Sequence, residues 1–525
     1  MERFHFTETD LQRMKTHQIS EAQVKAQLAR FRQSSIFMRL QRPCIPGDGV
    51  HRIDPATTER HLDLYSRAAQ EGRFTKFVPA SGAATRMFQS LLQIYHLPQF
   101  LEPQELHRNA ELGVAVACDF LKFLEDIHRF AFIEDLQKAL ARDGLDLSVL
   151  IESHRYRTVL EYLLTDIGLN YGALPKGLLK FHLYSEGSRT AVEEHLEEAV
   201  HYLVCGKKKC RLHFTVSPEH EGRFREFFEQ VRPDYERRHG VIYEVGFSHQ
   251  HPSTNTIAAD GLNRPFRDRF GRLVFRPGGH GALLANMSDL QGDLVYIKNV
   301  DNVAQVRFVD TIGLWKRILG GCLVALEAQV HHLVRQLEGA LTPKSVEQAE
   351  AFVVEQLHTR LPKNSSAWPL EKRHAYIRER LDRPIRVCGV VQNVGEPGGA
   401  PFWVEDHSGE PSIQIVEKAQ VDFGSPKQLE IWNSSTHFNP VDLVCSMRNY
   451  LGQPFDLDRF VDHDAVFISK KSVEGRSLQA LELPGLWNGA MSRWLTVVVE
   501  VPRITFNPVK TVFDLLKPEH QPPPG

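Results

Sequence analysis

Short apolar segments alternate with amphipathic segments in the middle of this chain, and the alternation limits the folds open to it. Residues 177–184, 209–217 and 241–248 contain Val, Ile, Leu and Phe in runs short enough for buried strands. Residues 188–204 and 221–238 lie between them and have the spacing of amphipathic helices. This order predicts an α/β fold with a mixed, mostly parallel sheet and helices on both faces. Ligands bind beyond the carboxyl ends of strands in such sheets, so those ends are where a site is expected.

The sequence PASGAATRM follows one apolar run, at residues 74–78, and opens a helical pattern. Small residues let backbone N–H groups approach an anion, and a helix N-terminus favours negative charge. An arginine at the same turn can grip phosphate oxygens with its forked donors. The alternative is a tight strand-to-helix turn with a surface arginine. The candidate phosphate ligands are Ser81, Gly82, Ala83, Thr85 and Arg86.

Two further segments carry charged side chains beside predicted strands. Lys176 follows Pro175 just before the strand pattern of residues 177–184, where its ammonium could reach a phosphate or simply be exposed. Asp301 stands in NVDN at the end of another apolar run. A carboxylate at the tip of a strand suits Mg²⁺ held between phosphates, and the alternative is an ordinary Asn/Asp turn.

A glycine-rich loop, FRPGGHGALLANM, occupies residues 275–287. Gly278, Gly279 and Gly281 surround His280, and glycines in such number indicate a close approach of the backbone to something. The main chain of such a loop can hydrogen-bond a flat base. The alternative is a hairpin-like loop with no ligand.

Composition excludes several classes of function. The 525 residues have a formal net charge of −2 and no run of about 18 apolar residues, so neither nucleic acid nor a membrane is an expected partner. The charged N-terminus lacks the apolar segment of a signal peptide, and the seven scattered cysteines suit a reduced compartment, so we expect a cytoplasmic protein. His249 and His251 lie two residues apart without a third ligand, which argues against a metal site there.

The pattern of segments predicts four regions. Residues 1–70 form a helical segment with a Pro/Gly-rich loop near residues 43–54, and residues 71–310 form the α/β core with a helical insertion at 100–170. Residues 311–380 form a helical connector that includes a polar linker near 361–373, and residues 381–525 form a β-rich C-terminal domain. The last residues, KPEHQPPPG, are expected to be disordered.

Taken in order, these motifs resemble those of the UDP-sugar pyrophosphorylases and related nucleotidyltransferases that make nucleotide sugars. ASGAATRM resembles their Ala-Gly-Gly-x-Gly-Thr-Arg-Met signature, Pro175-Lys176 their Pro-Lys, RPGGHGALLANM their base-binding loop, and IKNVDN their metal-binding strand end. The whole chain is also identified as a member of a bacterial family known as domain of unknown function 4301, on the blocks PGDG, PASGAATRM, PK and NVDN. Membership of that family supplies no activity.

The resemblance implies a nucleotidyltransferase-like (GT-A, Rossmann-like) core that uses Mg²⁺, a nucleoside triphosphate and a sugar phosphate. It implies that Gln250 lies near the base, that Lys470 supplies a second phosphate-contacting lysine, and that Asn302 or Lys470 touches the sugar phosphate. It implies catalytic roles for Arg86 and Lys176, metal binding by Asp301, and base binding by the loop around His280. It names neither the sugar nor the base, and it gives no oligomeric state.

Two departures from the pattern bear on the reaction. Ser81 and Ala84 replace two glycines of the signature, and a helical block separates Arg86 from Lys176 where those enzymes have a short loop. The sequence therefore predicts a nucleotidyltransferase that joins a sugar 1-phosphate to a nucleoside triphosphate and releases pyrophosphate. The alternatives are a glycosyltransferase that uses a nucleotide sugar, and a non-catalytic protein that binds a nucleotide or nucleotide sugar.

Overall fold

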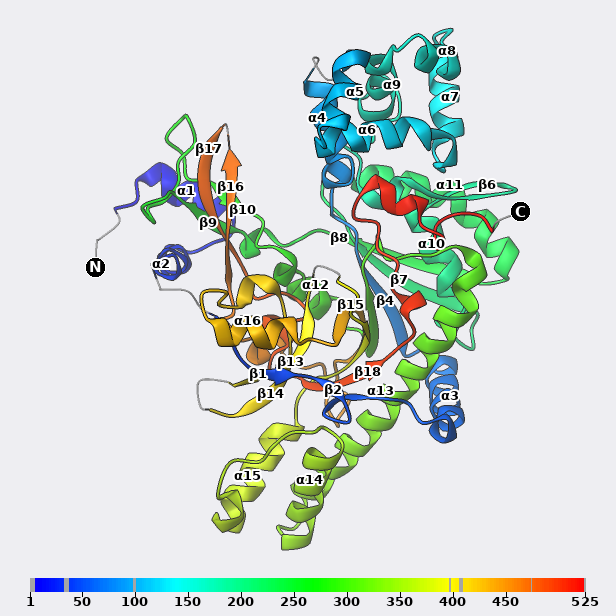
Figure 1. Cartoon of the computed structure of the whole chain (residues 1–525). Coiled ribbons are helices and arrows are strands. Elements are labelled where there is room, and N and C mark those ends of the chain that lie inside the picture. Colours follow the sequence, from blue (N-terminus) through cyan, green and yellow to red (C-terminus); the bar gives the residue numbers. More distant parts are fainter. Residues whose placement is uncertain are drawn as a thin grey trace. The chain divides into compact units, whose positions relative to one another are not determined.

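The computed structural model of the chain describes residues 5–32, 37–97, 101–395, 398–405, 409–473 and 475–523. It divides into two compact units, each built from separate stretches of chain (Figure 1). The first unit comprises Met1–Phe77, Ser248–Ile297 and Trp315–Arg503, and the second comprises Val78–Phe247, Lys298–Leu314 and Ile504–Gly525. The fold is mixed α/β with a large, mostly parallel sheet and a β-rich C-terminal region, as the sequence predicts.

Most strands of the large sheet belong to the first unit, in the order β2-β3-β18-β12-β15-β11-β4. Their bounds are β2 Ile45–Pro46, β3 Gly49–His51, β18 Leu495–Glu500, β12 Ile385–Gln392, β15 His437–Ser446, β11 Leu294–Lys298 and β4 Phe74–Pro79. The ladders β2/β3, β3/β18, β18/β12 and β11/β4 are parallel, and β12/β15 is antiparallel. β7 (Lys209–Thr215) and β8 (Ile242–Ser248), in the second unit, are the last strands of the order.

Two smaller sheets also belong to the first unit. One has the order β1-β13-β14 and the other β10-β9-β17-β16. Their bounds are β1 Arg39–Pro43, β13 Ala400–Glu405, β14 Pro411–Val416, β10 Phe275–Arg276, β9 Thr256–Ala259, β17 Arg476–Glu482 and β16 Phe467–Val473. The sequence interpretation of residues 43–54 as a loop is wrong in part, because β2 and β3 form within this range and pair with each other.

The helical segments of the first unit begin at side chains that cap them. Thr7 and Ser20 form capping boxes at the first two helices, and Asp54 caps the third by accepting a hydrogen bond from Ala56 N. The polar linker predicted near residues 361–373 is wrong in part, since a helix begins at Leu370. The bounds are α1 Glu8–Thr16, α2 Glu21–Arg30, α3 Pro55–Gln70, α12 Leu283–Asp289, α14 Pro343–Glu355, α15 Leu370–Leu381 and α16 Pro426–Asn433; α13 Val309–Glu338 begins in the second unit.

The second unit contains the predicted helical insertion, coloured blue to cyan in Figure 1. Within residues 100–170 the helices are α5 Pro103–Glu111, α6 Ala115–Glu125, α7 Ile133–Ala141, α8 Leu147–Glu152 and α9 Tyr156–Leu164, and α4 Gln89–His96 precedes them. They enclose a core of aromatic rings in which neighbouring centroids lie 5.1 to 6.4 Å apart. The rings are those of Phe88, Phe120, Phe123, Phe130, Phe132, Tyr156 and Tyr171.

Two helices and a hairpin complete the second unit: α10 Ala191–Ala199, α11 Glu221–His239, β5 Lys180–Tyr184 and β6 Gly187–Thr190. The sequence places residues 177–184 in the parallel sheet, but β5 pairs only with β6, in a two-stranded antiparallel sheet. The helix predicted from residue 188 begins at Ala191 instead. The reason is that the Thr190 hydroxyl accepts the Glu193 N–H as an N-cap, so residues 187–190 are free to pair with β5.

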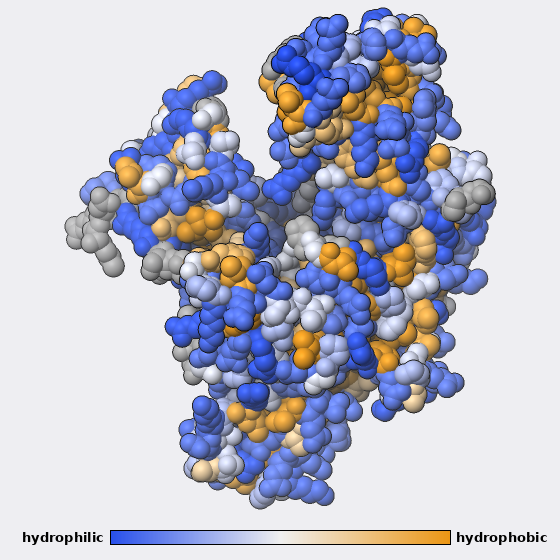
Figure 2. Space-filling model, in the orientation of Figure 1, coloured by the Kyte–Doolittle hydropathy of each residue, from blue (hydrophilic) through white to orange (hydrophobic). Residues whose placement is uncertain are grey.

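The face of the molecule drawn in Figure 2 is mostly hydrophilic, with scattered hydrophobic residues. Within the described parts of the chain, no helix has the length and apolar character needed to cross a membrane.

Candidate functional site

The turn after β4 lies against the segment that carries Lys176. Ala84 N donates a hydrogen bond to Leu174 O at 3.1 Å, and Lys176 N donates to Gly82 O at 3.2 Å. An antiparallel bridge forms between the two segments. The two segments that the sequence nominates for phosphate, although separated by the whole helical insertion, are therefore neighbours.

The loop after β11 lies beside the same turn. β4 and β11 are parallel neighbours, so their carboxyl ends meet at one edge of the sheet. Val300 N donates a hydrogen bond to Pro79 O at 3.3 Å, which joins the loop that carries Asp301 to the end of β4. The structure thus brings three of the predicted segments together at a strand-end edge, all within the second unit.

Two lysines converge on one buried carboxylate at this edge. Lys176 Nζ donates to Asp301 Oδ2 at 2.9 Å and to Val509 O at 2.6 Å, and Lys510 Nζ donates to the same Asp301 Oδ2 at 3.0 Å. Lys176 and Asp301 are buried, at 9% and 7% exposure, whereas the Lys510 side chain is 56% exposed. We call these three residues the two-lysine site. With two ammonium groups and one carboxylate, it favours a further anion.

The charges of the two-lysine site act on one another. Burial acts to raise the pKa of the Asp301 carboxyl, but the positive charges of Lys510 and Lys176 outweigh burial and hold that pKa below its ordinary value. Asp301 is therefore ionised at neutral pH. Burial lowers the pKa of the Lys176 ammonium, and the charge of Asp301 offsets this only in part. An arriving anion would relieve the cost of keeping Lys176 charged in a buried place.

Asp301 is also the residue at which the sequence predicts Mg²⁺. Its Oδ1 is buried and has no hydrogen-bond partner, so one carboxylate oxygen is available as a ligand. Across the described residues, no group of three or more His, Cys, Asp or Glu could hold a metal ion. Mg²⁺ is usually held by one or two carboxylates together with substrate phosphates and water. Asp301 therefore fits a metal that arrives with a nucleotide.

Helix α10 supports the loop that carries Asp301, and every one of its residues is buried. Lys298 Nζ, at the end of β11, contacts Glu198 Oε2 at 2.5 Å, and His195 Nε2 hydrogen-bonds Val300 O at 3.2 Å. These contacts fix the backbone on both sides of Asn299. The helix carries four buried glutamates, Glu193, Glu194, Glu197 and Glu198.

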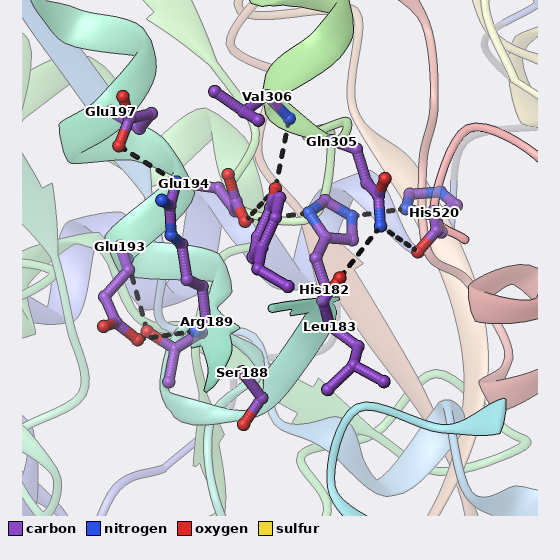
Figure 3. Close-up of polar contacts among 12 residues, drawn as sticks. His182, Leu183, Ser188, Arg189, Glu193, Glu194, Glu197, Gln305, Val306 and His520 are labelled. Carbon is purple, nitrogen blue, oxygen red and sulfur yellow. Dashed lines mark hydrogen bonds and ion pairs between the residues drawn. The ribbon is translucent and has the colours of Figure 1, made fainter. Parts of the chain in front are cut away.

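Figure 3 shows partners of two other glutamates of α10. Arg189 Nη1 donates to Glu197 Oε2 at 2.9 Å, and the Tyr184 hydroxyl donates to Glu194 Oε1 at 2.8 Å. Gln305 Nε2 donates to Leu183 O and to a carbonyl of the C-terminal segment, both at 3.3 Å. The polar network therefore connects α10, β5, the segment after Asp301 and the end of the chain.

The remaining candidates of the second unit differ in their surroundings. Asn302 is buried at 1% exposure, where its Oδ1 accepts from Asn507 N at 2.8 Å and its Nδ2 donates to Thr505 O at 3.3 Å. Its amide holds the C-terminal segment, and its contact with a sugar phosphate stays a prediction. Arg86 is exposed and has no side-chain partner among the described residues, and Ser81, Gly82, Ala83 and Thr85 are exposed beside it.

The glycine-rich loop belongs to the first unit, and its glycines meet the protein's own backbone. A Cβ on Gly278 would lie 2.4 Å from Thr254 O, and one on Gly281 would lie 1.9 Å from Pro484 O. Gly279 has φ of +77°, a conformation that favours glycine. Packing of this loop against the segment after β17 therefore requires these glycines even without a ligand.

His280 has partners of its own within the first unit. Its Nδ1 accepts a hydrogen bond from Leu486 N at 2.9 Å, and its ring stacks on Trp487 with centroids 4.1 Å apart and planes 5° apart. Its Nε2 lies 3.4 Å from Glu417 Oε1. This environment holds the ring in one orientation, and recognition of a base by the loop stays a prediction.

Gln250 and Lys470 also belong to the first unit. Gln250 is half-buried, and its Nε2 donates to Asn255 Oδ1 at 3.4 Å. Lys470 is exposed on β16, where it pairs in register with Gln479 of β17. Their proposed contacts with base and phosphate stay predictions.

Sequence reasoning missed Lys510 and misjudged the end of the chain. The sequence predicts disorder for residues 517–525, of which 524 and 525 lie outside the described residues, but His520 is 1% exposed and Gln305 N donates to Glu519 O at 3.1 Å. The available signal was the pattern TVFD, in which Thr511 and Asp514 form a capping box next to Lys510. That pattern marks ordered structure immediately before the expected tail.

The model of the family described as Domain of unknown function (DUF4301) matches residues 7–521. The chain belongs to this family. The matched residues include those of the two-lysine site. No curated protein matches the chain.

The solved structures that resemble the chain include the following three. The uridine diphosphate N-acetylglucosamine pyrophosphorylase of Trypanosoma brucei is 14% identical over 97% of this chain and 82% of its own, with a TM-score of 0.46. The UDP-glucose phosphorylase of the same organism is 13% identical over 98% and 80%, with a TM-score of 0.43. A variant of UDP-glucose pyrophosphorylase from Leishmania major, in complex with UDP-glucose, is 13% identical over 98% and 79%, with a TM-score of 0.41. Similarity at this level is too weak to assign an activity.

Proposed function

We propose that the protein is a nucleotidyltransferase that forms a nucleotide sugar from a sugar 1-phosphate and a nucleoside triphosphate, with release of pyrophosphate. The observation that carries the proposal is the two-lysine site, in which Lys176 and Lys510 meet one buried carboxylate at a strand-end edge beside the small-residue turn. The resemblance of the motifs to those of the UDP-sugar pyrophosphorylases supports the class of substrate.

In this reaction an oxygen of the sugar 1-phosphate attacks the α-phosphorus of the triphosphate. The bond from that phosphorus to the oxygen that bridges to the β-phosphate breaks, and pyrophosphate leaves with the electron pair. The protein's task is to position the two reactants and to neutralise charge. Lys176 and Lys510 would contact phosphate oxygens, and the exposed guanidinium of Arg86 would offer paired donors at the turn.

Mg²⁺ would supply positive charge between phosphate oxygens when it is bound, and Asp301 would hold it through Oδ1. Asp301 Oδ2 would keep its two lysine contacts, so one carboxylate would serve both the metal and the lysines. In the first unit, Gly278, Gly279 and His280 would bind the base with Gln250.

The test is pyrophosphate release from the purified protein with Mg²⁺, four nucleoside triphosphates and a panel of sugar 1-phosphates. Release that needs one triphosphate together with one sugar phosphate is the expected result. Lys176→Met and Lys510→Met should each lower kcat/KM about 10²- to 10³-fold, as the loss of one charge-stabilising contact does. Lys138→Met is the matched control, because the Lys138 side chain is 73% exposed on α7, outside the site.

Unchanged release in Lys176→Met and in Asp301→Asn would contradict the roles given to these residues. No release under any combination, together with thermal stabilisation by a nucleotide sugar, would favour the glycosyltransferase alternative or a binding protein. Lys470→Met tests the sequence prediction that Lys470 contacts phosphate. A loss of kcat/KM as large as that of Lys510→Met would give both lysines a place in the reaction.

A further inference from the structure

The C-terminal segment at residues 504–521, which we call the strap, contacts each part of the two-lysine site. Val509 N donates to Asp301 O at 3.0 Å, and Val509 O accepts from Lys176 Nζ. Val512 N donates to Met87 O at 3.0 Å, next to Arg86. The strap also supplies Lys510 itself, so the site is complete only while the strap is docked.

The far end of the strap is anchored by a contact between two histidines, drawn in Figure 3. His520 Nδ1 lies 2.8 Å from His182 Nε2, with ring centroids 5.1 Å apart. His182 is fully buried on β5, and its Nδ1 lies 2.9 Å from Glu194 Oε1. The result is a buried chain of one carboxyl group and two imidazoles that ends on the strap.

Proton counting makes this anchor sensitive to pH. A nitrogen–nitrogen contact of 2.8 Å is a hydrogen bond only when one nitrogen carries a proton and the other does not. If both imidazoles take up an additional proton, two N–H groups face each other and two positive charges stand side by side in a buried place. The docked strap therefore tolerates one proton in this contact and not two.

The charged groups around the chain do not remove this restriction. Arg189 acts on His182 with a further positive charge, and Asp514 and Lys517 of the strap act on His520 with opposite signs. Burial raises the pKa of Glu194 to about 8, so this carboxyl is already protonated near neutral pH and gives no counter-charge. Burial also lowers the pKa of His182 to about 3, and that of His520 well below its ordinary value.

We propose that the strap is a proton-sensitive lid on the two-lysine site, docked while His182 and His520 share a single proton and released on acidification. Release frees Lys176 from Val509 O and withdraws Lys510 from Asp301. Release would also switch off nucleotidyl transfer. This consequence rests on the proposed function, whereas the proposed motion of the strap does not rest on it.

The test is hydrogen–deuterium exchange of the full-length protein at pH 7.5, 6.5 and 5.5, without nucleotide. The ratio of strap exchange to that of a reference peptide over β12, in the first unit, cancels the intrinsic pH dependence of amide exchange. A released strap binds one proton more than a docked strap once the pH falls below about 6.5, the ordinary pKa of histidine. The ratio should therefore change little from pH 7.5 to 6.5 and rise about five- to tenfold from 6.5 to 5.5.

Two variants separate the anchor from other acid effects. His520→Gln keeps a side chain that can donate a hydrogen bond to His182 or accept one from it, but that does not titrate. The exchange ratio of this variant should therefore be nearly independent of pH, whatever its value at pH 7.5. His107→Gln removes an exposed histidine of α5 and should keep the wild-type rise. A wild-type ratio that is constant from pH 7.5 to 5.5 would overturn the proposal, as would the same rise in His520→Gln. Neither result depends on whether the protein transfers nucleotides.

Discussion

The buried ion pair beneath the Asp301 loop gives a sharp test of how the second unit is held together. Lys298 Nζ lies 2.5 Å from Glu198 Oε2, and the two side chains are 1% and 3% exposed. The Tyr202 hydroxyl donates to the other oxygen, Glu198 Oε1, at 2.7 Å. Glu198→Gln keeps the shape of the side chain and an acceptor for Tyr202, and it removes only the negative charge.

The size of the effect follows from the burial of Lys298. Without a carboxylate, the ammonium stays in a place that water cannot reach, and breaking a buried pair in this way typically costs about 3–5 kcal/mol. We therefore expect Glu198→Gln to lower the unfolding free energy of the second unit by about this amount. Replacing both partners, as Glu198→Leu with Lys298→Met, should recover most of the loss, since no unpaired charge remains.

The assay uses the distribution of tryptophan between the two units. All six tryptophans belong to the first unit, so their fluorescence in urea reports chiefly on that unit. Hydrogen exchange of β7 and α10 peptides, measured against urea concentration, gives the free energy of opening of the second unit. Glu134→Gln is the matched control, because its pair with Lys138 is 59% and 73% exposed and contributes little. A loss below about 1 kcal/mol in Glu198→Gln would refute the reasoning.

Two further predictions concern glycine and pH. Gly281→Ala should lower the stability of the first unit by about 1–3 kcal/mol, read as a lower melting temperature by tryptophan fluorescence, because its Cβ would lie 1.9 Å from Pro484 O. Gly261→Ala, in the same unit and with no atom within 4 Å of its Cβ, should be neutral to stability, and the reverse order would contradict the packing described here. Burial raises the pKa of Glu194 to about 8 in the folded protein, whereas its pKa in the unfolded chain is near 4.5. The contribution of Glu194 to stability is therefore complete below pH 4.5 and is lost as the pH rises through 8. In the wild-type protein, the opening free energy of α10 should decline by about 1.4 kcal/mol per pH unit between pH 6.5 and 8. Glu194→Gln should abolish this decline. A decline that persists in the variant would exclude Glu194 as its source.

The sequence allowed much of the fold to be predicted, because burial on both faces of a strand leaves a continuous apolar run. β4 and β11 are buried along almost their whole length, and β11 was found from such a run. β4 was found from Phe74, Phe77 and Val78, although the polar Thr75 and Lys76 between them are buried as well. β5 was assigned to the wrong sheet, since a strand's composition says nothing about its partner. The division into two units was also beyond local patterns, because each unit gathers stretches that are far apart along the chain.

The candidate site shows the same limit. Arg86, Lys176 and Asp301 lie beside predicted strands or helices, where a charged residue is conspicuous, and the structure places their segments together. Lys510 follows no strand, and only tertiary contacts bring it within 3.0 Å of Asp301. The glycines around His280 fit either a base-binding loop or a loop without a ligand, because a glycine looks the same in sequence whether the backbone approaches a base or another part of the chain.

The pairing of the turn at Gly82 and Ala84 with Leu174 and Lys176 has a consequence for the kinetics of folding. These contacts are far apart in sequence, and non-local contacts form slowly when they wait for a random encounter of distant chain segments. The helices between them share their own aromatic core, and compact local folding of that block would deliver its two ends to the same place. The rate at which the helical insertion folds would then set the time at which the two-lysine site first exists, so a core substitution such as Phe132→Leu should delay the site without touching any residue in it.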